Sequence, residues 1–211
     1  MSYLEVTQDM VIQAVRTLHN LIYEQWKTQL FLSPKWFGIV AFIIFSYILC
    51  FRLLDKTRYT RLFLFGSLIT VFYTVYDIIG VNFLLWHYTF RIVPTMPSIM
   101  LDNLTIIPLY SMLVFQYTKT WTSFAAFYAV LAAMLSYGLP MFGIVKVINW
   151  SILYNIVLVV FLGLLARAVV IGIERLEEKA GSELSTPAST HLTPQPVLKH
   201  MERESEDRNE P

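Results

Sequence analysis

The apolar positions of this chain gather into five long stretches separated by short polar connectors. The stretches lie at about residues 36–53, 62–84, 99–117, 122–142 and 149–173. Each is close to the ~20 residues that an α-helix needs to cross a lipid bilayer. The pattern predicts an all-α fold, a polytopic integral membrane helix bundle over residues 35–175 with about five transmembrane helices.

Residues 1–34 show a different pattern, that of an amphipathic N-terminal helix. Its apolar residues recur at steps of three and four, and they are Val11, Val15, Leu18, Ile22 and Trp26. Ser2 and Glu5 have the spacing of a capping box, and Pro34 predicts the end of the helix. Such a helix could lie in the membrane interface, pack on the bundle or bind a partner.

The chain becomes polar after residue 175, and Ser, Thr, Pro and charged residues dominate from residue 181. A segment with so little apolar surface cannot offset the entropy that ordering would cost. We therefore expect residues 176–211 to form a disordered polar tail.

Basic residues are distributed unequally among the connectors. One side of the membrane would carry eight of them, Arg52, Lys56, Arg58, Arg61, Lys119, Arg167, Arg175 and Lys179, and the other side four, Lys27, Lys35, Arg91 and Lys146. Because cytoplasmic connectors carry the excess of Lys and Arg, we expect the N-terminus outside and the C-terminus in the cytoplasm.

Small and polar residues form a stripe along the second apolar stretch. Gly66, Thr70, Tyr73, Asp77 and Gly80 are spaced by three or four residues and therefore share one helix face. Such a stripe should face the protein interior, because lipid would penalise the acid.

Six polar residues gather toward the predicted outer side as a candidate pocket: Asp77, His87, Arg91, Asp102, Asn103 and Asn155. An ionisable residue inside a span costs about a few kcal/mol, so Asp77 needs a partner or a purpose. It could pair with Arg91 or His87, or accept bonds from tyrosine hydroxyls, and hold helices together; it could equally bind a ligand. The predicted inner side shows little besides Gln116 and ordinary connector charges.

The other pocket candidates also have two interpretations. Asp102 and Asn103 could cap a helix start instead of lining a site. His87 lies beside Trp86 where aromatic belts occur, and could be an anchor or a ligand-binding group. Arg91 could hold an anionic group or only snorkel to the interface.

Composition excludes several classes of function. Hydrophobic residues make up 56% of the 211 positions and charged residues 15%, against about 25% in soluble domains. A net charge of +1 gives no sign of nucleic-acid binding. The single cysteine offers no cysteine-based metal site, and HExxH, Walker A, GxSxG and GxGxxG patterns are absent. A metal site formed by Asp77, His87 and Asp102 is conceivable, although their spacing matches no recognised signature, and we expect no cofactor.

Three segments resemble a family of small multi-pass membrane proteins of endospore-forming Gram-positive bacteria. They are WHY after the second stretch, DN followed by IPLYSMLVFQYTKTW, and NWSILYN. The similarity covers roughly residues 35–170, and Asn103, Pro108, Gln116, Trp121, Asn149 and Trp150 carry most of it. This family has no established activity; the resemblance implies a bacterial cytoplasmic membrane and an envelope or sporulation context.

These patterns leave three functional hypotheses. The first is a non-enzymatic protein that acts in envelope assembly, in sensing or as an accessory subunit, with the lipid bilayer and a membrane protein or a second copy as partners. The second is a small-molecule binding or transport module with an outward-facing polar pocket. The third and weakest is a membrane enzyme acting on a lipid or isoprenoid.

Overall fold

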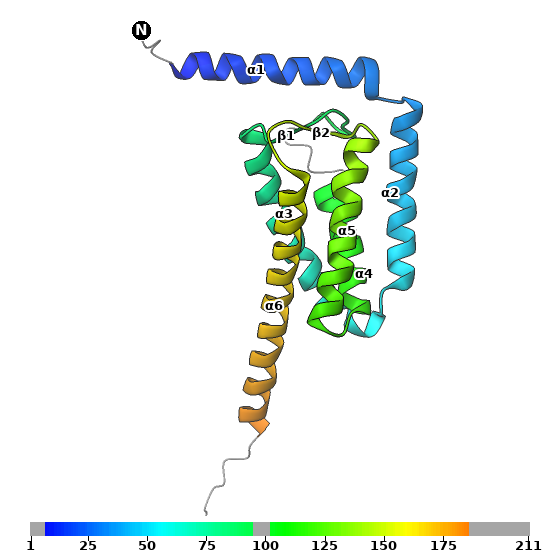
Figure 1. Cartoon of the computed structure of the whole chain (residues 1–211), viewed down its shortest axis with the longest axis vertical. Coiled ribbons are helices and arrows are strands. Elements are labelled where there is room, and N and C mark those ends of the chain that lie inside the picture. The colour runs from blue at the N-terminus through cyan, green and yellow to red at the C-terminus, as the bar shows by residue number, and fades with distance from the viewer. Residues whose placement is uncertain (1–6, 95–101, 186–211) are drawn as a thin grey trace, which may run out of the picture. The chain divides into compact units, whose positions relative to one another are not determined.

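The computed structural model describes residues 7–94 and 102–185 (Figure 1). The chain divides into two compact units, Met1–Ile173 and Glu174–Pro211. The helix bundle belongs to the first unit. The described part of the second unit is the end of the last helix.

The N-terminal helix α1 spans Gln8–Gln25 and continues as a π-helical turn, Trp26–Leu30. Thr7 caps its start by accepting a hydrogen bond from the amide of Met10. The predicted capping pair, Ser2 and Glu5, lies outside the described residues. The predicted apolar face is present, and most of its residues are exposed; Ile22 is buried.

Four helices are long and apolar enough to cross a membrane. They are α2 (Pro34–Leu53), α3 (Tyr59–Asn82), α5 (Trp121–Met141) and α6 (Ile152–Ser185), and α3 follows a 3-10 turn at Lys56–Arg58. Each overlaps one of the predicted stretches. Helix α2 begins where Ser33 caps the amide of Trp36 and proline occupies the first turn, so the position of Pro34 separates α1 from α2.

A fifth pass is made by a shorter helix. A five-residue π-helix, Asp102–Ile106, leads into the 11-residue α4, Ile107–Tyr117. Together they reach at most about 24 Å at ~1.5 Å per residue, less than the ~30 Å of a bilayer core. Residues 99–101, the predicted start of this stretch, lie outside the described residues.

Strand pairing shows that α4 nevertheless carries the chain across the bundle. Strand β1 (Trp86–Tyr88) follows α3, strand β2 (Val145–Val147) follows α5, and the two strands pair with each other. Helices α3 and α5 therefore finish at the same end, called here the ribbon end (Figure 1). At the opposite end, Gln116 of α4 donates to the carbonyl of Leu53 and accepts from the amide of Asp55. The described bundle thus has a fifth helical pass, but α4 is shorter than the transmembrane helix predicted there, and four helices are long enough to span.

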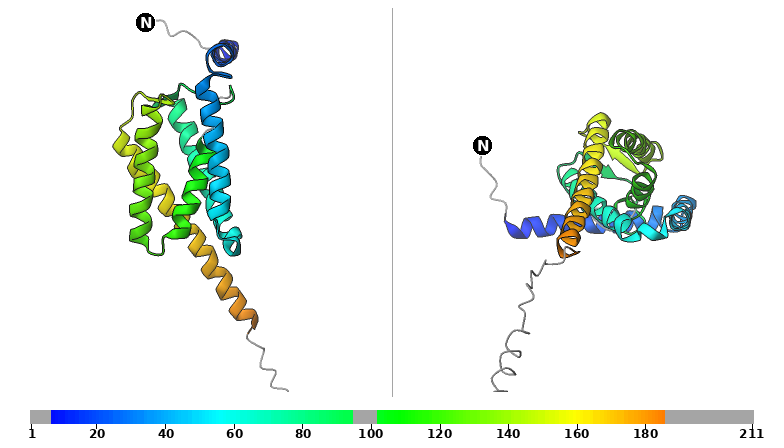
Figure 2. Two further views of the ribbon diagram at one scale, coloured as in Figure 1. Left: turned by 90° about the vertical axis from the view of Figure 1, so that its right-hand side faces the viewer. Right: turned by 90° about the horizontal axis from the view of Figure 1, so that it is seen from below.

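Helix α4 lies among the other helices and packs on α2, α3 and α5 (Figure 2). The core is aromatic: the rings of Phe65 and Phe115 stack at 4.3 Å between centroids, and Phe124 and Tyr128 extend the cluster. Helix α2 is the least buried of the four long helices: only 11% of its most apolar segment is buried inside the protein. It therefore presents most of its surface to the surroundings, as its uniform sequence suggests.

The predicted disordered tail needs a correction at its start. Helix α6 continues to Ser185, ten residues beyond residue 175. The added residues include Glu177, Glu178, Lys179 and Ala180, all strong helix formers, so the helix continues although its apolar pattern has ended. Residues 186–211 lie outside the described part of the chain.

Candidate functional site

A two-stranded antiparallel ribbon joins the two connectors at the ribbon end. Trp86 pairs with Val147, His87 with Lys146, and Tyr88 with Val145. The carbonyl of Leu85 accepts from the amides of Ile148 and Asn149 and extends the junction. The ribbon therefore fixes two chain segments that lie about sixty residues apart in the sequence.

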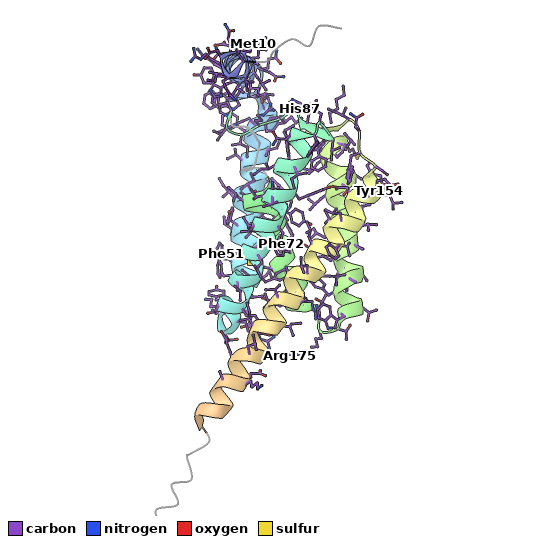
Figure 3. The ribbon with its side chains drawn as sticks, turned by 90° about the vertical axis from the view of Figure 1, so that its left-hand side faces the viewer. Met10, Phe51, Phe72, His87, Tyr154 and Arg175 are labelled. Atoms are coloured by element: carbon purple, nitrogen blue, oxygen red, sulfur yellow. The ribbon has the colours of Figure 1, made fainter. Side chains whose placement is uncertain are left out.

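Alternation along β1 decides which side chains reach the bundle. Successive strand residues point to opposite faces, and the burial of β1 follows this rule: Trp86 is 6% exposed and Tyr88 is 4% exposed, with the half-buried His87 between them. Figure 3 shows His87 at this end of the bundle and Phe51 toward the other. The sequence WHY thus places two aromatic donors on the inner face of the ribbon.

Both donors bind the acid of α3. Asp77 is 4% exposed, and its Oδ1 accepts hydrogen bonds from Trp86 Nε1 and Tyr88 Oη, both at 2.9 Å. Asn103 is buried and interacts with the same carboxylate. The second oxygen, Oδ2, is covered and has no hydrogen bond of normal geometry to a described residue. Within residues 7–94 and 102–185, no salt bridge reaches Asp77.

Gly80 makes this arrangement possible. A Cβ atom built on Gly80 would lie 1.9 Å from the ring of Trp86, so the indole lies directly against the backbone of α3. Asp77 is one helical turn earlier on the same face. The glycine of the predicted stripe therefore sets the position of the donor that binds the acid of the same stripe.

A second hydrogen-bonded chain closes the site from the side. The hydroxyl of Tyr76 on α3 donates to Asn155 Oδ1 on α6, and Asn155 Nδ2 donates to Ser136 Oγ on α5 at 2.7 Å. The ring of Tyr76 lies 5.0 Å from that of Trp86. Three helices are thus connected beside Asp77.

These groups surround a cavity of about 80 Å³. Its polar lining is Asp77, Asn103, Ser136 and Asn155, and its aromatic lining is Tyr73, Tyr76, Trp86, Tyr88 and Trp150. The volume has room for several water molecules or one small group, and is well below the 300–1,000 Å³ typical of drug-sized ligands. The arrangement can hold a small ligand between a carboxylate and several aromatic rings.

The structure brings together three of the six predicted pocket residues. Asp77, Asn103 and Asn155 line the cavity, whereas His87 and Arg91 do not. The predicted pairing of Asp77 with either of these is wrong, and the alternative of bonds from tyrosine hydroxyls is confirmed by Tyr88. The side chain of Asp102 lies outside the described part of the structure.

His87 and Arg91 form a separate basic pair near the ribbon. Burial of the imidazole and the neighbouring charge of Arg91 lower the pKa of His87 from its ordinary value. Burial also lowers the pKa of the Arg91 guanidinium, which is 3% exposed. The surroundings therefore disfavour the positive charge of each side chain, and neither side chain pairs with Asp77.

Sequence reasoning missed the ribbon and the neighbours of Asp77. Two strands of three residues carry too little periodicity to be recognised, and Trp86 and Tyr88 were predicted only as interfacial aromatics. One signal was available: the exposed Lys146 lies between Val145 and Val147, which is the alternation of a strand. Within the described ranges, no cluster of three His, Cys, Asp or Glu side chains could hold a metal ion.

Comparison with known proteins gives no relative from which a function could be transferred: no protein-family model, curated protein or solved structure matches this chain. The function is therefore inferred from the residues of the site. The resemblance to the family from endospore-forming bacteria stays a prediction.

Proposed function

We propose that this protein is a membrane-embedded binding protein for a small organic cation, with Asp77 as its counter-ion. The observation that carries the proposal is the carboxylate of Asp77, which is buried beside a cavity, whose Oδ2 has no hydrogen bond of normal geometry, and which has no basic partner among the described residues. An isolated carboxylate in a medium of low polarity must be neutralised or paired. A cation in the cavity would pair it.

The aromatic lining favours an ammonium group over a metal ion. Tyr76, Trp86 and Trp150 present rings around the space next to the carboxylate. Faces of Trp and Tyr attract cations, and cages of such rings are a known means of binding quaternary ammonium groups. A metal ion would instead need several oxygen or nitrogen ligands. A small alkylammonium headgroup therefore suits both the charge and the surface of the cavity.

Orientation and location complete the proposal. The excess of basic residues at the end opposite the ribbon supports a cytoplasmic location for that end, so the cavity would open toward the outside. With the family resemblance, this supports a bacterial cytoplasmic membrane. Binding at an outward-facing site suits a sensor or the binding step of a transporter.

The test is the thermal stability of the detergent-purified protein with choline or tetramethylammonium. A ligand present at a hundred times its Kd stabilises the native state by about 2.7 kcal/mol. We expect choline to raise the unfolding midpoint and its neutral isostere, 3,3-dimethylbutan-1-ol, to leave it unchanged. Equal effects of the two compounds would reject charge recognition.

Variants locate the effect. Asp77→Asn should remove the response to choline, whereas Asp55→Asn, which changes a carboxylate near the opposite end, should keep it. If Asp77→Asn fails to fold, Trp150→Leu offers a second variant, because it removes one ring and leaves the carboxylate. A response to choline that survives both substitutions would place the binding site elsewhere.

A second candidate function is assembly with another membrane protein or a second copy. Its support is α1, on which Val11, Val15 and Leu18 are 46%, 61% and 43% exposed. Val15→Glu with Leu18→Glu should then abolish cross-linking to a partner in cells. If the protein is monomeric and captures no partner in cells, assembly is rejected and cation binding remains the proposed function.

A further inference from the structure

The end of the bundle opposite the ribbon contains a second cavity, of about 260 Å³. The charged residues there lie in or beside the connectors, and the proposed cation site does not use them. Four cationic side chains line this cavity, and no acidic side chain among the described residues does so. We call this the basic cavity, and its cationic residues are Arg58, Arg61, Lys119 and Arg167.

Arg167 is the fixed element of the basic cavity. Its side chain is 4% exposed, and its terminal nitrogens donate to Thr118 Oγ1 at 3.2 Å and to the carbonyls of Thr118 and Lys119 at 3.4 and 3.0 Å. The guanidinium also lies over the rings of Phe124 and Trp121, at 4.7 and 5.1 Å. Its Nε atom is buried and has no hydrogen-bond partner within the described residues.

The guanidinium groups of Arg61 and Arg167 both lie near the ring of Phe115. The centres of the Arg61 and Arg167 guanidinium groups lie 5.1 and 5.7 Å from the centroid of Phe115, and the two charges interact unfavourably. Asp55 is the acidic residue nearest to Arg58 and Arg61 in the sequence. It pairs with Arg58 at 3.5 Å and does not line the cavity. Both guanidinium groups line the same cavity, so their positive charges together favour an anion within it.

We propose that the basic cavity binds a phosphate group. Guanidinium groups recognise phosphate oxygens through paired, charge-assisted hydrogen bonds, and lysine adds a mobile positive charge. The volume admits a phosphate together with part of the molecule that carries it. Arg167 also has a structural role, because it fastens the connector between α4 and α5, whereas Lys119 adds a further cation to the lining of the same space.

The phosphate could belong to an anionic lipid or to a soluble molecule. In the proposed orientation, the basic cavity lies at the cytoplasmic face, where anionic headgroups are bound by basic pockets between helices. Phosphate recognition here is independent of Asp77, since the two cavities share no lining residue.

The experiment compares phosphate sources on the full-length protein in neutral detergent. Dioleoylphosphatidylglycerol should raise the unfolding midpoint more than dioleoylglycerol, which carries no phosphate, and the difference should shrink as sodium chloride is added. Potassium phosphate is tested against potassium chloride at equal ionic strength. A response to the lipid alone identifies a headgroup site, and a response to phosphate as well identifies the phosphate group as sufficient. No response to either, or equal responses to both lipids, overturns the proposal.

Variants separate the basic cavity from general surface charge. Arg61→Gln and Lys119→Gln should each weaken phosphatidylglycerol binding about tenfold or more, as expected for the loss of a charge-assisted hydrogen bond. Arg52→Gln removes an exposed charge outside the cavity and should leave the affinity unchanged. Arg61→Gln and Lys119→Gln are used because Arg167→Gln would also release the connector. Equal affinity in all variants and the unmodified protein would overturn the proposal, whereas Asp77→Asn should keep the phosphate response.

Discussion

At the residue scale, the candidate cation site depends on Gly80, a residue that has no side chain. Gly80 gives the indole of Trp86 the space to lie on α3, and the indole then donates to Asp77. No other described glycine would bring an added Cβ so close to a neighbour, although Gly66 and Gly163 are also tightly packed, against Met112 and Tyr128. A change of one methyl group at Gly80 should therefore affect both stability and binding.

Gly80→Ala should lower the free energy of unfolding by about 1–3 kcal/mol, because overpacking displaces Trp86. Denaturant titration of the purified protein measures this value. Gly38→Ala is the matched control: nothing lies within 4 Å of its Cβ position, and alanine favours the helix. A variant at Gly80 as stable as the control would show that Trp86 is not held where the structure places it.

His87 provides a pH-dependent contribution to stability. Its pKa in the folded protein lies below its ordinary value of 6.5, because of burial and the charge of Arg91. On acidification the unfolded chain therefore takes up this proton first, so the stabilising contribution is present above pH 6.5 and is lost as the pH falls below it. Thermal unfolding should show a smaller decrease between pH 7 and 5 in His87→Gln than in the unmodified protein. His19→Gln changes an exposed residue of α1 and should reproduce the unmodified curve.

At the element scale, polar contacts between helices fix the shape of the site. The chain from Tyr76 through Asn155 to Ser136 joins α3, α6 and α5 at one level. Between membrane helices, apolar surface gives little preference for one packing over another, since lipid is equally apolar. Hydrogen bonds and close contacts at small residues therefore select the arrangement.

Asn155→Ala should lower the free energy of unfolding by about 1–3 kcal/mol, the sum expected for two hydrogen bonds in this setting. Asn149→Ala, at an exposed position, is the control. A double-mutant cycle with Ser136→Ala should show a coupling energy above zero. Strict additivity of the two substitutions would contradict a direct bond.

The sequence was informative about the elements and less so about their contacts. Apolar length located all four long helices to within three residues at their starts, because burial in lipid requires an uninterrupted apolar stretch. The stripe of α3 correctly placed Asp77 and Gly80 in the interior. In α5, however, the buried residues are Phe124, Tyr128, Ala132 and Ser136, whereas the small polar Thr122 is exposed. Small and large residues can both face a core, so residue size alone did not identify the face.

At the scale of the whole molecule, the two cavities of the described bundle are lined by opposite kinds of ionisable group. A buried acid lies under the ribbon, and a cavity lined by arginine and lysine lies at the other end. The orientation proposed from the basic residues would place the acid toward the outside. Charged groups inside a membrane protein mark functional sites by default, and the two sites would then serve different compartments.

Labelling in intact cells tests this orientation. In a Cys50→Ala background, Asn149→Cys near the ribbon should react with a membrane-impermeant maleimide, and Lys56→Cys at the opposite end should react only after the cells are opened. Both positions are exposed, and Cys50 is buried. The reverse pattern would place the ribbon end, and with it the cavity beside Asp77, on the cytoplasmic side.

The ribbon can form only late in synthesis, because its two strands lie far apart in the sequence. Strand β1 and Asp77 leave the ribosome first, and β2 and Asn155 follow about sixty residues and two helices later. Until then the acid lacks part of its enclosure, so the half-inserted chain must keep Asp77 hydrated or shielded by another protein.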